Sequence, residues 1–468
     1  MNSPLKISHL GAENCVTGSC HLLQANGLNI MVDCGMAQGN DSPSAMDSWP
    51  IKPTEIDYLF LTHAHIDHIG RVPELIQRGF KGEIICSHPT KALLVPMLAD
   101  AMRFSDIPAD DVRSVERTID DLSWGFEYGE QFDLTKNISF KMKRAGHILG
   151  SCFVHFKDEK SGYSVLFSGD LGAKDAPILP DPEIPDAADL VILESTYGDR
   201  LHDDRTQRIK RLGQVLTRSL SDNGKVFIPA FSLGRTQELI YEMDRLFSDP
   251  DYQSMFPALR GQERPPVFVD SPLGLEITQI YAQQSTFWDK ESWGLLDKGD
   301  HPIDFDGLYA VKNHRDHLKL CDARGPAIIL AGSGMCTGGR IVDHLAKGIE
   351  NPKNDILFVG YQAAGTPGRA IQDYADKPNG YIYLDGDRKA INANVHTLTG
   401  YSAHADQAGL VDWIESMPEK PGAIKLVHGE GKAMKVLGEM LEKRGYNIFP
   451  AEGCKKTVRV RLCVSVTK

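Results

Sequence analysis

The chain has 468 residues, of which 41% are hydrophobic and 24% are charged, and its formal net charge is −12. This length predicts two or three domains with enough apolar residues for sizeable cores. The negative charge excludes a protein that coats nucleic acid through a generally basic surface, so any nucleic acid must be held by a local groove or by metal ions.

The first part of the chain alternates short apolar runs with turns. The expected strands cover residues 5–9, 29–32, 58–62, 83–86, 138–141 and 165–168, with helical stretches such as 90–103 between them. Strands that alternate with helices predict a layered α/β domain.

A second unit is indicated by a change in composition, because residues 199–211 are dense in charge. After them, apolar residues at helical spacing alternate with buried strands, which we expect at 225–230, 267–270 and 327–331. This pattern predicts another α/β unit with sites at the carboxyl ends of its strands.

The last part of the chain returns to short strands, such as 424–427, from about residue 386. We therefore expect one domain made of residues 1–200 and 386–468, which an inserted domain at 201–385 interrupts.

Nine cysteines are spread singly along the chain, and none belongs to a CxxC pair. An odd count without such pairs predicts reduced thiols rather than a disulfide framework or a thiolate zinc site. The first residues lack the basic and apolar segments of a secretory signal, and no apolar run reaches the roughly 18 residues of a membrane helix. We expect a cytoplasmic protein without a membrane span.

The densest group of metal-binding side chains is the run of His63, His65, Asp67 and His68, directly after the apolar residues 58–61. The two imidazoles at i and i+2 can converge on one cation, and the next two side chains can serve a second. Imidazole and carboxylate suit Zn²⁺, with Mn²⁺ and Fe²⁺ as alternatives. Three histidines and one aspartate within six residues favour a metal site over a surface loop that is rich in histidine by chance.

Further ligands are expected at later strand ends. His147, Asp170 and His428 each follow an apolar run and precede a glycine or a short turn. A single histidine in such a place is more often structural. As companions of the first run, however, these residues become candidate ligands.

Together these residues resemble the metallo-β-lactamase superfamily, and specifically its β-CASP branch of nucleic-acid-processing nucleases. That branch includes the endonuclease subunit of eukaryotic pre-mRNA 3′-end cleavage and its bacterial and archaeal relatives. The resemblance extends over essentially the whole chain and implies an α/β fold, an αββα sandwich with an inserted α/β β-CASP domain. Asp33 in MVDCG matches the first motif, a structural aspartate that supports the metal loop.

The resemblance also implies a ligand set for two zinc ions. One ion takes His63, His65 and His147, the other takes Asp67, His68 and His428, and Asp170 bridges them. Glu194 in ESTYGD, His404 in YSAHAD and His428 in VHGE match the three β-CASP motifs. Members that act on DNA usually lack a histidine at the third of these, so His428 favours RNA.

Two departures from the family pattern affect details of substrate contact. Gly332-Ser333-Gly334-Met335 stands where close relatives often have two serines. Asp343 stands where relatives often have a histidine before His344.

These matches imply a zinc-dependent ribonuclease that leaves a 5′-phosphate and a 3′-hydroxyl. Two zinc ions about 3.5–4 Å apart lower the pKa of a shared water and bind a phosphate oxygen. Asp67 is expected to orient the nucleophile as well as to bind metal. His404, held and kept protonated by Glu194, is the expected general acid for the leaving O3′.

Phosphates away from the cleaved bond need other donors, and three turns in the inserted domain offer them. The candidates are Ser232, Arg235 and Thr236 at a helix start, Ser333 and Arg340 around a Gly-rich turn, and Arg369 after Gly365-Thr366. Plain tight turns are an alternative of similar weight. We expect single-stranded RNA to lie in a cleft between the two domains.

The stretch His314-Arg315-Asp316-His317 looks like a further ligand set. It lies in a charged segment that we expect to be helical, and we interpret it as a solvated helix face.

Three other functions are compatible with parts of the pattern. They are a DNA-acting nuclease of the same branch, a small-molecule hydrolase such as a thioesterase, and a non-catalytic scaffold subunit of an RNA-processing complex. His428 argues against the first, the large insertion against the second, and the filled ligand positions against the third. Endonuclease or 5′→3′ exonuclease action, RNA specificity, native metal and homodimer formation are left open by the residues.

Overall fold

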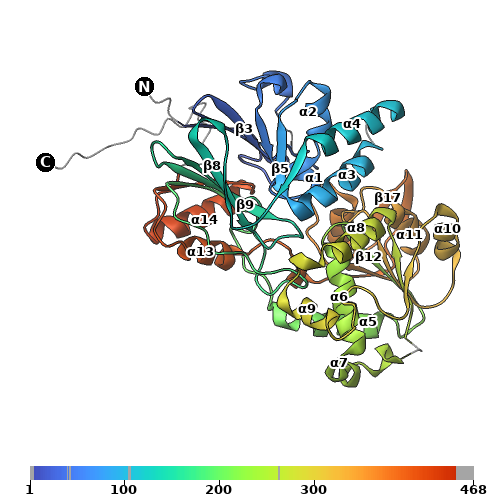
Figure 1. The fold of residues 1–468 in the computed structure, drawn as a ribbon. Helices are drawn as coiled ribbons and strands as arrows, with labels where there is room; N and C mark the ends of the chain where they lie inside the picture. Colours follow the sequence, from blue (N-terminus) through green and yellow to red (C-terminus); the bar gives the residue numbers. More distant parts are fainter. Residues whose placement is uncertain (1–4, 40, 42–43, 104–106, 262–263, 450–468) are drawn as a thin grey trace. The chain divides into compact units, whose positions relative to one another are not determined.

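The structure is a computed structural model that describes residues 5–449 except 40, 42–43, 104–106 and 262–263. Cys454 and Cys463 lie outside these described residues. The chain forms two compact units (Figure 1). The first contains the residues up to Lys174, Asp181–Leu201 and the residues from His404 on, and the second contains Asp175–Pro180 and His202–Ala403.

The first unit is built on two six-stranded sheets. One has the order β1 (Lys6–Gly11), β2 (Cys20–Ala25), β3 (Leu28–Val32), β4 (Tyr58–Phe60), β5 (Glu83–Ser87) and β6 (Ser123–Phe126). The other has the order β20 (Ala423–Val427), β11 (Leu190–Glu194), β10 (Ser164–Phe167), β9 (Cys152–Asp158), β8 (Ile138–Arg144) and β7 (Gln131–Asp133). All the strands expected in the first part of the chain are present, and the structure adds β2, β6, β7, β9 and β11.

The two sheets share one apolar core, because alternate side chains of their strands point toward each other. The ring of Phe60 in β4 packs edge-to-face on Phe140 in β8 and on Phe156 in β9, with centroids 4.9 Å and 4.7 Å apart. Such aromatic contacts between facing sheets bury large apolar areas and hold the layers together.

Helices cover the outer faces of both sheets (Figure 1). Beside the first sheet lie α1 (Ile66–Ile69), α2 (Val72–Gln77), α3 (His88–Met102) and α4 (Ala109–Leu122). Beside the second lie α13 (Gln407–Glu415) and α14 (Gly431–Lys443), whose apolar sides form a second core with the outer face of that sheet. The expected αββα sandwich is therefore confirmed.

The second unit contains one six-stranded sheet in which all neighbouring strands are parallel. Its order is β14 (Leu308–Ala310), β13 (Val267–Asp270), β15 (Ala327–Ala331), β12 (Lys225–Pro229), β16 (Asp355–Phe358) and β19 (Asn394–Thr397). A parallel sheet covered on both faces needs continuous apolar strands, and β15 is buried at every position. The expected strands at 225–230, 267–270 and 327–331 are confirmed.

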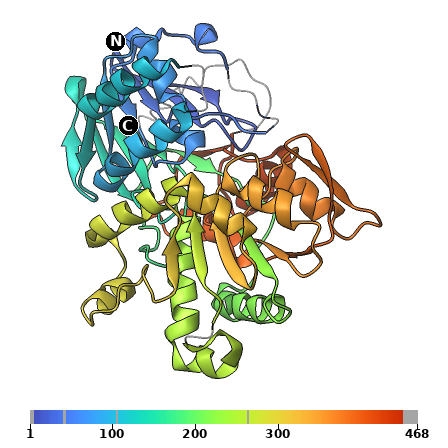
Figure 2. The ribbon, with the colours of Figure 1, turned by 90° about the vertical axis from the view of Figure 1, so that its right-hand side faces the viewer.

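Helices accompany this parallel sheet, as the yellow-green to orange part of Figure 2 shows. They are α5 (Arg208–Ser219), α6 (Arg235–Ser248), α7 (Pro250–Met255), α8 (Pro272–Gln283), α9 (Lys290–Leu296), α10 (His314–Asp322), α11 (Arg340–Gly348) and α12 (Pro367–Tyr374). Side chains of α10, α11 and α12 share a core with one face of the sheet.

The second unit extends to Ala403, beyond the boundary that we expected at residue 385. Strand β18 (Asp387–Ala390) pairs with β17 (Tyr381–Leu384), and β19 adds to the edge strand β16. Polar edge strands such as β19 carry little apolar signal, so only their pairing assigns residues 386–403 to this unit.

Over the described ranges, no helix combines the length and the apolar character that crossing a membrane requires.

Candidate metal centre

The loop that carries the first histidine run follows β4 and continues into α1. It is held by main-chain hydrogen bonds from the neighbouring segments, with Ser19 N donating to Asp67 O at 2.8 Å and Cys34 N donating to His68 O at 2.7 Å. Gly35 makes this approach possible, because a Cβ atom there would lie 1.6 Å from the Asp67 carbonyl oxygen. The DCG segment after β3 therefore packs directly on the metal loop.

Asp33 supports this loop from below with both carboxylate oxygens. Its Oδ1 accepts the backbone N–H of Thr62 at 2.8 Å, and its Oδ2 lies 2.6 Å from His68 Nδ1. The side chain is 1% exposed. A carboxylate behind an imidazole fixes the tautomer and leaves the other ring nitrogen free to bind a metal, which agrees with the supporting role predicted for Asp33.

One group of donor atoms contains His63, His65, His147 and Asp170. His65 Nδ1 lies 3.1 Å from both His63 Nε2 and His147 Nε2. Asp170 Oδ2 lies 3.5 Å and 3.6 Å from the same two Nε2 atoms. Burial lowers the pKa of all three imidazoles, that of His65 to about 4, so the rings are neutral and can offer lone pairs.

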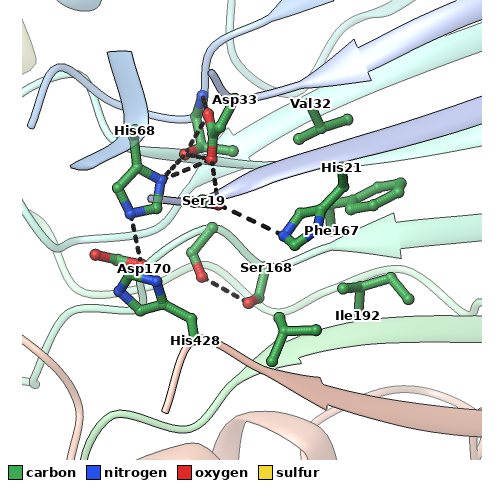
Figure 3. A pocket seen from close by; sticks show the side chains of 13 residues that line it. Ser19, His21, Val32, Asp33, His68, Phe167, Ser168, Asp170, Ile192 and His428 are labelled. Carbon is green, nitrogen blue, oxygen red and sulfur yellow. Dashed lines mark hydrogen bonds and ion pairs between the residues drawn. The ribbon is translucent and has the colours of Figure 1, made fainter. Parts of the chain in front are cut away.

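A second group contains Asp67, His68 and His428. His68 Nε2 and His428 Nε2 lie 3.2 Å and 3.3 Å from Asp170 Oδ1 (Figure 3). Asp170 thus turns one oxygen to each group. Although burial opposes it, the charges of the surrounding histidines hold the pKa of Asp170 well below its usual range, which keeps it a carboxylate.

These donor atoms lie close together, but several of them make no hydrogen bond to one another. His68 Nε2, Asp170 Oδ1 and both ring nitrogens of His428 are buried and make no hydrogen bond, because the short separations lack hydrogen-bond geometry. Buried polar atoms without partners are costly and need an explanation. Cations between these donors would supply the missing partners, so the residues present fit a divalent metal at each group.

The pairing of β20 with β11 positions His428. Glu194 at the end of β11 lies opposite Val427, so the loops after both strands emerge at the same edge of the sheet. His428 has a left-handed backbone with φ of 51°, and its carbonyl accepts a hydrogen bond from Thr196 Oγ1 at 3.1 Å. An uncommon backbone held by its neighbours is typical of functional loops.

Glu194 and His404 form a carboxylate–imidazole pair beside the donor groups. His404 Nδ1 lies 3.2 Å from Glu194 Oε1 and 3.9 Å from Asp170 Oδ2. Burial works against its protonation, but the charges of Glu194 and Asp170 and the hydrogen bond to Glu194 raise the pKa of His404 to about 9. His404 therefore holds a proton near neutral pH. It also lies within metal-binding distance of Asp170 and His428, so a ligand role is the alternative to an acid role.

The predicted phosphate donors lie in the second unit, and two of their arginines are already paired there. Arg235 is 8% exposed and forms an ion pair with Glu238. Arg340 donates to Asp270 Oδ1 and to the Val311 carbonyl, both at 2.7 Å. The charges of these two guanidinium groups are thus balanced or hydrogen-bonded inside the unit, and their role toward phosphate stays a prediction.

The other predicted donors differ in exposure. Thr236 is 2% exposed, and its hydroxyl donates to the Phe231 carbonyl at 2.8 Å. Ser232 and Ser333 are partly buried and contact neighbouring hydroxyls. Arg369 pairs with an aspartate one turn away, yet 48% of its side chain is exposed. Of the three predicted arginines, Arg369 is the most accessible.

The stretch 314–317 begins helix α10, but the prediction of a solvated face is wrong for His317. Its ring is 0% exposed and, together with Cys321 and His344, forms a further group of close donor atoms. The sequence analysis missed this group because His344 comes from another helix. The available signal was the spacing of His317 and Cys321, which are four residues apart on one helix face.

The sequence matches models of three domain families. The metallo-β-lactamase superfamily matches residues 14–209, the β-CASP domain matches 236–371, and the Zn-dependent metallo-hydrolase RNA specificity domain matches 388–450. These matches follow one another over most of the chain.

Several characterised proteins are similar over nearly the whole chain. Ribonuclease TTHA0252 of Thermus thermophilus is 36% identical over 95% of this chain and 97% of its own. Transcription termination factor FttA of Methanocaldococcus jannaschii is 30% identical over 91% of this chain and 67% of its own. Cleavage and polyadenylation specificity factor 73 of Drosophila melanogaster is 30% identical over 94% of this chain and 62% of its own.

A crystal structure of a protein of unknown function from Enterococcus faecalis V583 has a similar fold, with a TM-score of 0.56 at 10% identity, over 96% of this chain and 98% of that one. The two donor groups sit at the strand ends of the αββα sandwich, and their residues lie within the superfamily match except His428, which lies within the RNA specificity match. From the sandwich, the inserted unit and the extent of the sequence matches, this chain belongs to the β-CASP branch of the metallo-β-lactamase superfamily.

Proposed function

We propose that this protein is a zinc-dependent ribonuclease that hydrolyses RNA phosphodiester bonds and leaves a 5′-phosphate and a 3′-hydroxyl. The observation that carries the proposal is the pair of buried donor groups that share Asp170, beside a histidine that holds a proton. The name of the 36% identical relative, a ribonuclease, and the RNA specificity domain matched at 388–450 support RNA as the substrate.

Two zinc ions would be held by the ligand set that the family pattern implies. His63, His65 and His147 would hold one and Asp67, His68 and His428 the other, with Asp170 between them. Neutral imidazoles and carboxylates suit Zn²⁺, and Mn²⁺ and Fe²⁺ accept the same donors. Ions bound there would supply an activated water and a positive clamp on a phosphate oxygen.

His404 would act as the general acid in this reaction. The ring gives a proton to the leaving O3′ atom, which otherwise departs as a strongly basic alkoxide. Glu194 contacts Nδ1 of this ring and would orient it toward the substrate. Because Glu194 also accepts the N–H of Leu171 at 2.6 Å, its carboxylate is fixed in place and orients the acid.

Phosphates farther along the strand would be bound by the inserted unit. Arg369 is the best placed of the predicted arginines because it is the most exposed.

We further expect a cytoplasmic protein. Light scattering of the purified chain tests whether it forms a homodimer, which the residues leave open.

Cleavage of matched oligonucleotides tests the function. The full chain reconstituted with Zn²⁺ is given single-stranded RNA and DNA of one sequence, each 5′-labelled, with a 5′-monophosphate, a 5′-hydroxyl or a blocked 5′ end. We expect RNA to be cleaved with 3′-hydroxyl products and DNA to be largely resistant, and the blocked end distinguishes internal cleavage from 5′→3′ digestion. A chain with two bound metals that cleaves neither substrate, or cleaves both equally, contradicts the proposal.

A further inference from the structure

Helices α10 and α11 of the second unit bring four potential ligands together. His317 and Cys321 lie four residues apart on one side of α10, and Asp343 and His344 are adjacent on α11. His317, Cys321 and His344 are 0%, 9% and 1% exposed, so their polar atoms are shielded from solvent. Buried histidines and a buried thiol in contact need a chemical reason for being together.

The inward atoms of these side chains have the separations of a tetrahedral metal site. Cys321 Sγ lies 3.7 Å from His317 Nε2 and 3.5 Å from His344 Nδ1. Zinc bonds of about 2.3 Å to sulfur and about 2.0–2.1 Å to nitrogen, at the tetrahedral angle, place sulfur and nitrogen about 3.6 Å apart. Asp343 Oδ2 lies 2.9 Å from His317 Nε2 but does not belong to the group of mutually close donor atoms.

The outward atoms of both imidazoles are held by one carboxylate. Asp270 Oδ2, at the end of β13, lies 2.6 Å from His317 Nδ1 and 2.6 Å from His344 Nε2. Asp270 is 0% exposed, and its other oxygen accepts from Arg340 at 2.7 Å. With the N–H of each ring directed at Asp270, His317 Nε2 and His344 Nδ1 keep their lone pairs, as in the arrangement found behind metal-bound histidines. Cys321 Sγ lies against the His317 ring, 3.7 Å from Nε2 and 3.9 Å from Nδ1.

We propose that Cys321 Sγ, His317 Nε2 and His344 Nδ1 bind a zinc ion that is additional to any metal of the first unit. The mixture of thiolate and imidazole suits zinc. Because the three ligands are buried and come from two packed helices, the ion is structural. On binding, the Cys321 thiol gives its proton to solvent, as a coordinating thiol does.

Such an ion cross-links α10 to α11 on one face of the parallel sheet. Through Asp270 and Arg340 it also fixes the Gly-rich segment 332–339, because Arg340 is the first residue of α11 after that segment. The metal-free alternative is an imidazolium at His317, with both ring nitrogens bound to the carboxylates of Asp270 and Asp343.

Cobalt substitution separates these alternatives in the full chain. Purified protein is stripped of metal and reconstituted with Co²⁺, and the near-ultraviolet sulfur-to-cobalt charge-transfer absorption is recorded. The candidate ligands of the first unit include no cysteine, so this band reports on the Cys321 site. We expect the band in the wild type, its loss in Cys321→Ser, and its retention in Cys336→Ser, a matched control because Cys336 is also buried in the second unit.

Two further measurements test the zinc site independently of the ribonuclease function and of the folding of Cys321→Ser. The Asp170→Ala variant should keep the band, so failure of the proposed ribonuclease function leaves this result intact. X-ray absorption of the wild type with zinc should show a sulfur neighbour at about 2.3 Å, whether or not Cys321→Ser folds. A wild type without the cobalt–thiolate band and without a sulfur neighbour, or an unchanged band in Cys321→Ser, overturns the site.

Discussion

The donor groups of the first unit and the Cys321 site of the second unit use the same side-chain chemistry on different supports. In the first unit, the histidines and Asp170 lie in and just after the loops that follow β4, β8, β10 and β20. In the second, the three proposed ligands lie on two helices, and only the supporting Asp270 ends a strand. Both regions place a buried carboxylate 2.6 Å behind a histidine, Asp33 behind His68 and Asp270 behind His317.

The two regions differ in whether their donor atoms have hydrogen-bond partners. Asp170 Oδ1 and both nitrogens of His428 make no hydrogen bond, and a protonated His404 stands beside them. At the Cys321 site, by contrast, both imidazoles contact the carboxylate of Asp270, and no atom of His317 or His344 is among the buried polar atoms without a hydrogen bond in the described residues. A donor set beside a separate acid suits catalysis, whereas a buried set held from behind by one carboxylate suits a structural ion. Variants of residues in each region test this difference.

The largest effect is expected for Asp170→Ala. Removing the carboxylate shared by both donor groups should release metal and reduce RNA cleavage by about 10³-fold or more, because bound metal contributes several kcal/mol to such reactions. Metal analysis by mass spectrometry and single-turnover cleavage check this. Asp133→Ala, an exposed aspartate of the same unit, is the control and should behave like the wild type. If the variant retains two metals, Asp170 is not a metal ligand.

His404→Ala should keep the metals and still lose about 10²-fold or more of its cleavage rate, as expected when a general acid is removed. The measurement is the rate constant of cleavage together with the metal content of the same sample. His88→Ala is a suitable control because His88 is half-exposed and belongs to neither donor group. If His404→Ala loses metal, His404 is a ligand rather than the acid; if it cleaves RNA at the wild-type rate, it is not the acid.

Asp33→Asn should weaken metal binding by about 10–100-fold, the usual effect of altering a supporting carboxylate. The amide can no longer attract the N–H of His68 with a full negative charge. Competition with a coloured chelator measures the affinity. Unchanged affinity would mean that Asp33 serves only to hold Thr62 and the loop.

Asp270→Asn is the matching change at the Cys321 site, and it should act on stability rather than on cleavage. Loss of the charge that holds two imidazoles and Arg340 should lower the free energy of unfolding by about 1–3 kcal/mol. Urea denaturation of the wild type and the variant measures the difference. A loss of cleavage as large as that of Asp170→Ala, without a loss of stability, would contradict a structural role.

The smallest effect is expected for Asp186→Asn, a surface reference for the buried carboxylates. Partial burial is outweighed by hydrogen bonds from Lys143 and Lys141, which hold the pKa of Asp186 below its ordinary value of 3.8. A carboxyl group whose pKa is lower in the folded than in the unfolded protein stabilises the fold when the pH is above its unfolded-state pKa. This contribution is lost as the pH falls through its folded-state pKa. At neutral pH the variant should lose less than about 1 kcal/mol, since the pair is near the surface.

Denaturation at several pH values checks the sign for Asp186→Asn. The difference in free energy of unfolding between the wild type and the variant should shrink as the pH falls from about 6 to about 3. A difference that grows on acidification would contradict the assigned direction.

The strand ends of the first unit could be predicted because their signals are local. An apolar strand followed by His63, His65, Asp67 and His68 indicates both the supporting element and the candidate ligands within eleven residues. The edge strand β19 could not be predicted, because its polar residues gain their place only by pairing with β16. For the same reason the inserted unit reaches Ala403 rather than residue 385.

The sequence by itself predicted the α/β character of both units and the run His63, His65, Asp67 and His68, since these rest on periodicity or on a contiguous motif, whereas the αββα sandwich and the full ligand set were implied by the family resemblance. The tertiary structure alone decided which oxygen of Asp170 faces which group, that Arg235 and Arg340 are paired internally, and that His317 is buried. It also joined Cys321 to a histidine on another helix, although the scattered cysteines had argued against a thiolate zinc site. The physical reason is that ligands from separate elements meet only when packing brings those elements together, and no spacing along the chain records that contact.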